Sequence, residues 1–587
     1  MNIFLIIFSF LAIANAQINV PGKYRALALK DLQKNGLMDE DESMLIYNLP
    51  ELDNAHLLAE VEAKERVDSE SKLTRKNDVD GAEEIFYSSK PSKTDPFTFG
   101  KAVQLNVSMN SADEFHWIIN ADTQTRMWRF KVYSKDAHSI SIYFSDFYLK
   151  PSAELYIIGL EDTLGAFTSL NNKEDRVFGI APVSGDFLIL EYIEPIPSGG
   201  AAALSEPSSI VVSHIVHGFR PNPFSMKSAA GSGNCHINVA CQEGSGKANA
   251  INSVGLLING KGTSFCTGAM VNNAKGDGRQ LFLTAEHCVG SDSVKNFMVG
   301  FHYQFKYCNS AYETKPQIKT VHGMRLLDKT DVSDFALLEV VEEIPNEWDV
   351  YMAGWDASSY SSRTGSFYGI HHPRGDTKKI SLFNGEINLV RLSDVNDGVN
   401  FLRIPRWEKG STEPGSSGSP LFDANGLIIG HLFGGDSSCS RLNAPDYYGA
   451  LSRDWMHTSN SIRPYLDPNG TASGKQVRGA ALKDLRTQTN PQNEPTATAD
   501  PAEQNVSTVT ITVTQTITKH STATSTVTIA KTTNVVVSRS TVTVQGEPST
   551  IFKEVTKTVA AQPVTVTQTF TRVPPPIISV RTVTVTK

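Results

Sequence analysis

Six cysteines constrain the fold of this chain more than any other feature, because all of them lie in one region. They are Cys235, Cys241, Cys266, Cys288, Cys308 and Cys439, and no other cysteine occurs among the 587 residues. An even number of cysteines confined to one region of an exported chain predicts three disulfide bridges within one domain. Spacing alone does not choose among the ways in which six cysteines can pair. The sequence therefore predicts one disulfide-bonded domain between two segments that lack this constraint.

The amino-terminal residues predict export. Residues 3–13 form an apolar run that is too short to span a bilayer comfortably. The run leads into the small-x-small pattern Ala-Asn-Ala, which is typical of a signal peptide, and we expect cleavage after Ala16. A membrane anchor is the alternative, since no Lys or Arg precedes the run. We expect a secreted, extracellular protein, and sequons at Asn106, Asn469 and Asn505 fit glycosylation of an exported chain.

Charge and composition limit the expected partners. The net charge is -8 at pH 7 and no block of Lys and Arg occurs, so nucleic acid is not an expected partner. No later segment is long and apolar enough to predict a membrane span. The motif HHPRGD (residues 371–376) contains two histidines and an Arg-Gly-Asp tripeptide. No further ligand spacing accompanies these histidines, and we expect neither a metal nor a cofactor.

Composition divides the chain into four segments. After the signal peptide (residues 1–16), residues 17–227 begin with a charged, partly helical stretch. From about residue 97 onward, alternating runs such as MWRFKVYS and DFLILEYIE predict the short strands of a small β-sandwich. Residues 228–467 hold every cysteine and a second series of strands, followed by helical spacing in ALSRDWMHTSNSIRPYL. The predicted fold is all-β, with a two-barrel domain that ends in a C-terminal helix.

Residues 468–587 form a low-complexity tail rich in Thr, Ser and Val. The tail lacks cysteine and has almost no aromatic residues, so it cannot build a packed core and we expect it to be disordered. Its composition resembles O-glycosylated stalks, which would suit association with a cell wall or matrix. The alternative is structural, because Thr-Val alternation is typical of strands that can pair with themselves. The pentapeptide ALKDL occurs at residues 28–32 and 481–485, either by chance or as a shared docking motif.

The loop GSTEPGSSGSPLFDANG (residues 410–426) raises the question of a catalytic serine. A serine hydroxyl is a poor nucleophile at neutral pH unless a base accepts its proton and a third group orients that base. His287, in LFLTAEHCVG, follows a predicted strand and can serve as the base. Asp334, in VSDFALLEV, opens an apolar strand, where a buried carboxylate needs a partner such as an imidazole N–H. The order His, Asp, Ser is that of the chymotrypsin-like proteases.

The chain resembles the chymotrypsin-fold serine endopeptidases and is most similar to the bacterial lysyl endopeptidase group. The motifs that carry the resemblance cover residues 228–467 and are GNCHINVAC, SFCTGAMVNN, LFLTAEHC, SDFALLE, YGIHHPRGD, TEPGSSGSPLFD and GGDSSCS through PDYYG. The resemblance implies that Ser417 is the nucleophile, that His287 takes its proton and that Asp334 orients the imidazole. It also implies that the backbone N–H groups of Gly415 and Ser417 form the oxyanion hole.

The resemblance further implies how the chain is bridged and processed. Residues 17–227 look like the propeptide of such enzymes. Residue 416 is Ser rather than the Asp that pairs with the new amino terminus in trypsin-like zymogens, so we expect activation by removal of the propeptide. Lys227 is the expected processing residue, cleaved by the enzyme itself. The implied bridges are Cys235–Cys439, Cys241–Cys308 and Cys266–Cys288.

The expected substrate pocket differs from that of trypsin-like enzymes, which carry an acid at the position of Ser411. The lysyl endopeptidases place an Asp shortly after the last cysteine. Asp446 in PDYYG matches it, although the intervening segment is slightly shorter here. A carboxylate in a closed pocket favours a cationic side chain. The strand edge that would pair with the substrate backbone consists of Leu432, Phe433, Gly434 and Gly435.

We therefore expect a secreted endopeptidase that acts on proteins or peptides and cleaves after Lys, with Arg as a further candidate. A glutamyl endopeptidase is the first alternative, because that group shares the G-x-S-G-S-P loop. It would need a basic pocket, against which Asp446 argues. The second alternative is a catalytically inactive, stalked adhesin, against which the complete triad argues.

Overall fold

The computed structural model describes the parts of the chain on which the following sections rest. They are residues 44–69, 73–77, 83–87, 96–109, 117–160, 163–196, 206–221, 231–309, 318–392, 400–457, 460–489, 508–516, 523–529, 564–570 and 578–586. Ala16, Lys227 and the sequon at Asn505 lie outside these residues, whereas Asn106 and Asn469 are exposed. The chain divides into two compact units, Met1–Pro491 and Gln492–Lys587.

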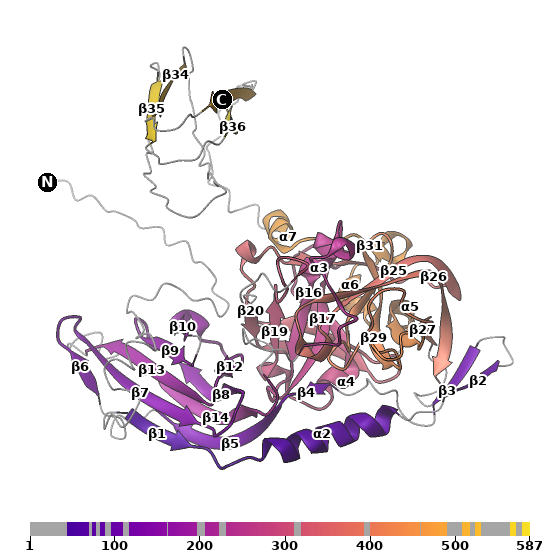
Figure 1. Cartoon of the computed structure of the whole chain (residues 1–587), viewed down its shortest axis with the longest axis horizontal. Coiled ribbons are helices and arrows are strands. Elements are labelled where there is room, and N and C mark those ends of the chain that lie inside the picture. The colour runs from indigo at the N-terminus through magenta and orange to yellow at the C-terminus, as the bar shows by residue number, and fades with distance from the viewer. Residues whose placement is uncertain are drawn as a thin grey trace. The chain divides into compact units, whose positions relative to one another are not determined.

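Two β-sheets form most of the segment that precedes the cysteine-rich domain (Figure 1). The first sheet has the strand order β1-β7-β13-β9-β10 with β6 beside β7, and the second has the order β11-β8-β14-β5 with β12 beside β8. The strands of the first sheet are β1 (Met44–Asn48), β6 (Ile118–Asn120), β7 (Thr125–Tyr133), β9 (Glu154–Ile158), β10 (Thr163–Phe167) and β13 (Phe187–Pro195). Those of the second are β5 (Gly100–Ser108), β8 (Ser139–Tyr148), β11 (Phe178–Gly179), β12 (Val183–Ser184) and β14 (Ser209–Gly218).

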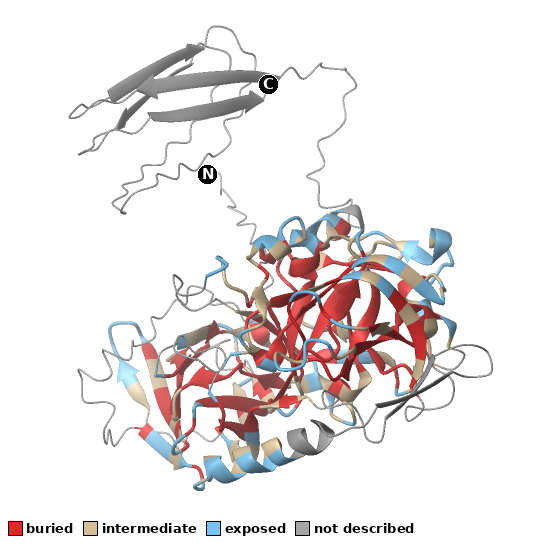
Figure 2. Cartoon of the chain, turned by 45° about the vertical axis from the view of Figure 1, so that its right-hand side comes forward, coloured by how far each residue is buried: buried red, intermediate tan, exposed pale blue. Residues whose placement is uncertain are grey.

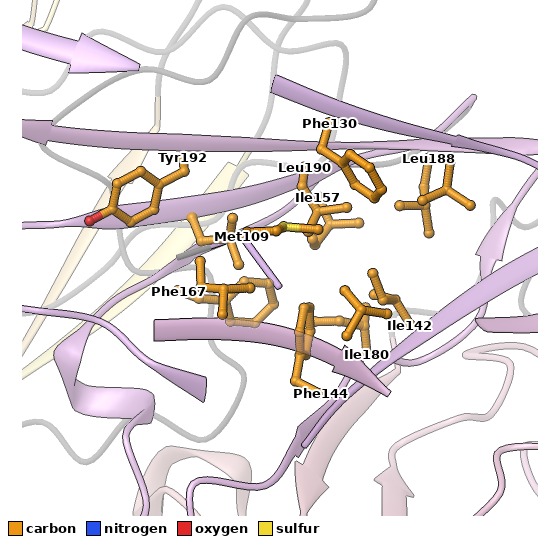
Figure 3. Close-up of a cluster of buried hydrophobic side chains, with 14 of the residues drawn as sticks. Met109, Phe130, Ile142, Phe144, Ile157, Phe167, Ile180, Leu188, Leu190 and Tyr192 are labelled. Carbon is orange, nitrogen blue, oxygen red and sulfur yellow. The ribbon is translucent and has the colours of Figure 1, made fainter. Parts of the chain in front are cut away.

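Apolar side chains from both sheets fill the space between them. Figure 3 shows Phe130 and Leu190 of the first sheet near Ile142 and Phe144 of the second, and all four are fully buried. Alternate residues of each strand point to this inner face, as expected for two packed sheets. The predicted β-sandwich is therefore confirmed, and helix α2 (Asn54–Ser69) occupies the stretch predicted to be helical.

The cysteine-rich domain is built on two further sheets, and buried residues fill its interior (Figure 2). The first sheet has the order β20-β19-β16-β17-β18-β22-β21, with β4 beside β17. Its strands are β4 (Phe97–Thr98), β16 (Val254–Ile258), β17 (Ser264–Val271), β18 (Leu281–Ala285), β19 (Met298–Phe301), β20 (Lys319–His322), β21 (Met324–Thr330) and β22 (Phe335–Val340). The main path of the second is β2-β3-β26-β25-β28-β29-β24-β31, with β15, β27 and β30 beside it. Its strands are β2 (Leu73–Asn77), β3 (Glu83–Tyr87), β15 (Ile237–Asn238), β24 (Gly354–Asp356), β25 (Ser362–His371), β26 (Lys379–Leu392), β27 (Asn400–Ile404), β28 (Pro420–Phe422), β29 (Leu427–Gly435), β30 (Asp446–Ala450) and β31 (Gln476–Val477). This is the all-β architecture with two strand units that the sequence predicts.

The domain ends later than the predicted boundary at residue 467. The expected C-terminal helix is present as α5 (Leu451–Met456), and α6 (Arg463–Leu466) follows it. Beyond residue 467, β31 pairs with β24, and β32 (Ala480–Ala481) pairs with β23 (Tyr351–Met352). Helix α7 (Leu482–Thr489) then buries Leu482 and Leu485 in the core. The boundary is therefore corrected to about residue 489. The second ALKDL copy (residues 481–485) contributes two leucines to the core. The first copy (residues 28–32) lies outside the described residues.

The second unit contains paired strands. Strand β33 (Thr508–Thr516) pairs with β36 (Ile578–Thr586), and β34 (Ala523–Ile529) pairs with β35 (Val564–Phe570). Thr and Val are β-branched and favour extended backbone. For these four segments the expected disorder is corrected in favour of the alternative, strands that pair with one another. Within the described residues, no helix is long and apolar enough to cross a membrane.

A polar contact links the sandwich to the cysteine-rich domain. Nζ of Lys173 is hydrogen-bonded to Nδ1 of His322, whose backbone N–H donates to Oε2 of Glu342 at 2.6 Å. Burial lowers the pKa of Lys173 to about 8, against the opposing charges of Glu342 and Asp175. Burial also holds the pKa of His322 well below its ordinary value, and the charge of Lys173 adds to this effect. The contact therefore keeps a neutral imidazole beside a lysine.

Candidate active site

Asp334 fixes His287 through two separate hydrogen bonds. Its Oδ2 lies 2.8 Å from Nδ1 of His287, and its Oδ1 accepts the backbone N–H of His287 at 3.0 Å. His287 lies in the short helix α4 (Glu286–Val289), which directly follows β18, and Asp334 directly precedes β22. Because β18 pairs with β22, the two residues meet at one end of that pair. The carboxylate is only 3% exposed, so the partner expected for a buried Asp is present.

The loop that carries Ser417 is held from below by β17. Thr267 uses its backbone N–H to bind the carbonyl oxygen of Ser417 at 2.9 Å and its hydroxyl to bind that of Gly415 at 2.8 Å. Gly415 and Gly418 adopt φ angles of 94° and 78°, a region that other residues rarely enter. A Cβ atom at Gly418 would also meet Thr284. The glycines therefore allow the loop to turn tightly against the strands beneath it.

The directions of the backbone N–H groups of Gly415 and Ser417 follow from the hydrogen bonds of the preceding carbonyl groups. The carbonyl of Pro414 accepts the backbone N–H of Arg374 at 2.6 Å, and that of Ser416 accepts the N–H of Ser419 at 3.0 Å. In a trans peptide, the N–H points opposite to the carbonyl of the preceding residue. The N–H groups of Gly415 and Ser417 are therefore directed away from these partners, which is compatible with the predicted oxyanion hole.

A disulfide ties the helix of His287 to β17, the strand that also holds the serine loop. The structure contains the bridges that the resemblance implied, Cys235–Cys439, Cys241–Cys308 and Cys266–Cys288. Sγ of Cys288 lies 3.7 Å from the carbonyl oxygen of Ser417. Nε2 of His287 is buried and has no hydrogen-bond partner among the described residues. Catalytic hydrogen bonds are often long without substrate, so this geometry is compatible with a His–Ser pair.

Asp446 is completely buried and is bound at one oxygen by three donors. Oδ2 accepts the indole N–H of Trp407 at 2.7 Å, the hydroxyl of Thr412 at 2.7 Å and that of Ser437 at 2.6 Å. Ser411, at the position of the trypsin acid, is buried with its hydroxyl 3.2 Å from that of Ser437. Sequence reasoning found Asp446 but missed its three partners: Trp407 lies 39 residues away and outside the quoted motifs, and the motifs that contain Thr412 and Ser437 do not show that these hydroxyls meet the carboxylate.

The predicted substrate-binding edge needs one correction. Both backbone groups of Leu432 bind the serine loop: its carbonyl accepts the N–H of Gly418 and its N–H donates to Ser419, each at 2.8 Å. Leu432 therefore supports the loop rather than a substrate backbone. Phe433 packs edge-on against His287, with ring centroids 6.3 Å apart. Phe433, Gly434 and Gly435 remain a predicted substrate edge.

The HHPRGD motif supports the serine loop. His371 is fully buried, with Nδ1 2.8 Å from the hydroxyl of Ser416 and Nε2 3.0 Å from that of Ser381. His372 contacts the carbonyl oxygen of Asp376 through Nδ1 at 2.9 Å. In the described part of the chain, two clusters have the spacing of metal ligands. Each consists of one histidine, His236 or His287, and two cysteines that are bonded to each other in a disulfide. These contacts therefore support a structural role for HHPRGD rather than metal binding.

Comparison with known proteins agrees with the resemblance to the lysyl endopeptidases. Residues 229–449 match the family model described as lysyl endopeptidase, C-terminal domain, which confirms the resemblance found in the sequence. A lysyl endopeptidase from Pseudomonas aeruginosa is 29% identical over 310 residues, which cover 49% of this chain and 64% of that protein. The chain thus spans less than two thirds of that relative's length.

Among solved structures, two examples are serine-protease neighbours of low overall similarity. The Rv3671c protease in an inactive form is 18% identical and covers 35% of this chain and 87% of its own, with a TM-score of 0.24. A serine endoprotease from Yersinia pestis is 14% identical and covers 36% of this chain and 63% of its own, also with a TM-score of 0.24.

Proposed function

We propose that this chain is a secreted serine endopeptidase that hydrolyses peptide bonds after lysine. The observation that carries the proposal is the pair of hydrogen bonds that Asp334 accepts from His287, beside the loop that holds Ser417. The family match over residues 229–449 supports the same assignment. Export itself rests on the predicted signal peptide and on the three disulfides, which are typical of oxidising compartments.

In the proposed reaction, Oγ of Ser417 attacks the carbonyl carbon of the scissile bond while Nε2 of His287 takes its proton. Asp334 holds the proton on Nδ1 of His287, which leaves Nε2 as the acceptor, and it stabilises the imidazolium that forms. The negative oxygen of the tetrahedral intermediate binds the N–H groups of Gly415 and Ser417. His287 then gives the proton to the leaving amine, and water hydrolyses the acyl-enzyme by the same steps.

The geometry of Asp446 favours lysine over arginine. Three donors already occupy Oδ2, so this oxygen is not available for a further contact. An ammonium group is a compact point charge that a carboxylate attracts without a bidentate contact. A guanidinium binds best through two parallel bonds to both oxygens of a carboxylate, which the occupied Oδ2 prevents. A glutamyl preference would place a second negative charge beside Asp446, so the chemistry of the pocket disfavours it.

We also propose that the enzyme matures by cutting after Lys227. Residues a few positions after this bond are tied to the domain: the backbone N–H and hydroxyl of Ser232 bind Oδ2 of Asp376 in the HHPRGD motif, and the N–H of Gly233 binds Oε2 of Glu413 in the serine loop at 3.0 Å. Cleavage a few residues earlier would leave these contacts intact. The position therefore combines a lysine with a bond that lies ahead of these contacts.

Cleavage of a peptide library by the purified protein, read by mass spectrometry, tests the specificity. We expect new termini after Lys, few after Arg and none after Glu. The Ser417→Ala variant serves as the control for contaminating proteases. Cleavage after Glu would favour the glutamyl alternative, and no cleavage by a folded, processed protein would favour the inactive adhesin.

A further inference from the structure

The β-sandwich and the protease domain share an apolar cluster. The relative exposed area of each of its nine buried residues is at most 8%. From the sandwich segment come Phe97, Phe99, Tyr143 and Val216, and from the protease domain come Leu256, Ile258, Phe265, Met298 and Tyr303. Because neither part alone encloses these side chains, the cluster is a docking surface between the two.

Strand β4 joins this surface to β17. Thr98 and Phe97 pair with Ser264 and Phe265 in antiparallel register, and the backbone N–H of Phe99 binds the carbonyl oxygen of Thr263 at 2.8 Å. The ring of Phe99 is stacked on that of Phe265, with centroids 4.1 Å apart and planes 4° from parallel. The sandwich therefore adds a strand and an aromatic anchor to the protease sheet.

The same stretch of β17 holds the catalytic loops. Cys266 forms the disulfide to Cys288, next to His287, and Thr267 binds the carbonyl oxygens of Ser417 and Gly415. On its other side, the ring of Phe265 lies against Gly375 so closely that a Cβ there would clash. The backbone N–H groups of Arg374 and Gly375 lie near Gly415 in turn. Two routes of direct contact thus run from Phe99 to the oxyanion loop.

We propose that, in the uncleaved chain, the sandwich is a positioning partner of the protease domain: docking of β4 and Phe99 on β17 orders the Ser417 loop for the proposed self-cleavage after Lys227. The partner of the apolar surface is the chain's own segment from residue 97 to residue 219. This role deepens the proposed function, because it concerns how the same site is assembled. Loss of this docking before cleavage would loosen the loop without touching any residue of the triad.

Hydrogen exchange of the full chain tests this role in the Ser417→Ala background, where no self-cleavage can occur. Phe99→Leu and Phe99→Ala remove the stacked ring, and Phe130→Leu removes an equally buried ring from the sandwich core as the matched control. We expect the Phe99 variants to raise exchange rates in peptides 264–271 and 410–419 by about tenfold or more, as expected when a buried contact is lost. The control should raise exchange only in sandwich strands.

The readout separates this inference from the proposed function, because it does not depend on catalysis. Faster exchange in 264–271 with an unchanged 410–419 would show docking without coupling and would overturn the proposal. Unchanged exchange in both peptides would overturn it too. An equal effect of Phe130→Leu on 410–419 would assign the response to general destabilisation and would likewise refute a specific role for Phe99. The milder Phe99→Leu keeps the test decisive if Phe99→Ala does not fold.

Discussion

Asp446→Asn should remove lysine preference while preserving the shape of the pocket. The amide oxygen of Asn can take the place of Oδ2 toward Trp407, Thr412 and Ser437, and an uncharged NH₂ group then replaces Oδ1. A buried ammonium would then find no negative charge at this position. Losing one partner of a buried ion pair costs about 3–5 kcal/mol. At about 1.4 kcal/mol per factor of ten, kcat/KM for lysine peptides should fall by about a hundredfold to a few thousandfold.

The assay compares matched peptides that carry lysine or norleucine before the scissile bond. Norleucine keeps the aliphatic stem without the ammonium, so its kcat/KM should change little in Asp446→Asn. Asp423→Asn is the control, because Asp423 is a buried carboxylate paired with Arg363 elsewhere in the second sheet. It should leave the lysine-to-norleucine ratio unchanged. A ratio that also stays unchanged in Asp446→Asn would refute the role of this carboxylate in specificity.

Three further predictions follow from the contacts. Thr412→Val, which removes one of the three donors to Oδ2 of Asp446, should lower kcat/KM for lysine peptides by about tenfold, since a hydrogen bond to a charged group contributes about 1.5–3 kcal/mol; an unchanged kcat/KM would contradict a role of this bond in holding the carboxylate. The pKa of His322 is lowered in the docked state, so stability is retained above its ordinary value of about 6.5 and lost as pH falls below it. The thermal midpoint of the Ser417→Ala chain should therefore drop between about pH 7.5 and 5.5, and His322→Phe should reduce that drop; an identical drop in both proteins would exclude this histidine as a source. Amino-terminal sequencing of the active protein should begin directly after Lys227, whereas Ser417→Ala should remain uncut there; normal processing of that variant in the absence of other proteases would rule out self-cleavage.

The contact between His287 and Asp334 could be predicted from short, contiguous motifs, whereas the disulfide pairing could be predicted only through the family resemblance, because spacing leaves it open. His287, Asp334 and Ser417 each lie in a motif that begins or ends a predicted strand, and pairing of β18 with β22 brings the first two together. Sequence reasoning could not find Thr267 or Trp407, because each acts through a partner far along the chain. Their contacts exist only after the sheets have formed.

The errors have equally local causes. The domain end was placed too early because β31 and β32 contain only two residues each, which leaves no periodicity to read. Leu432 was assigned to substrate from its place on a strand, although the backbone bonds that it makes to the serine loop depend on the folded register. The tail was assigned disorder from its lack of a core, whereas pairing between distant Thr/Val segments is a non-local property.

The central claim is that Ser417 is an activated nucleophile served by His287. It is tested most directly by reacting the processed protein with a fluorophosphonate and locating the adduct by peptide mass spectrometry. The account predicts one adduct, on Ser417, that is absent from Ser417→Ala and greatly slowed in His287→Ala. No adduct on the folded protein, or an adduct on another serine with Ser417 unmodified, would contradict it.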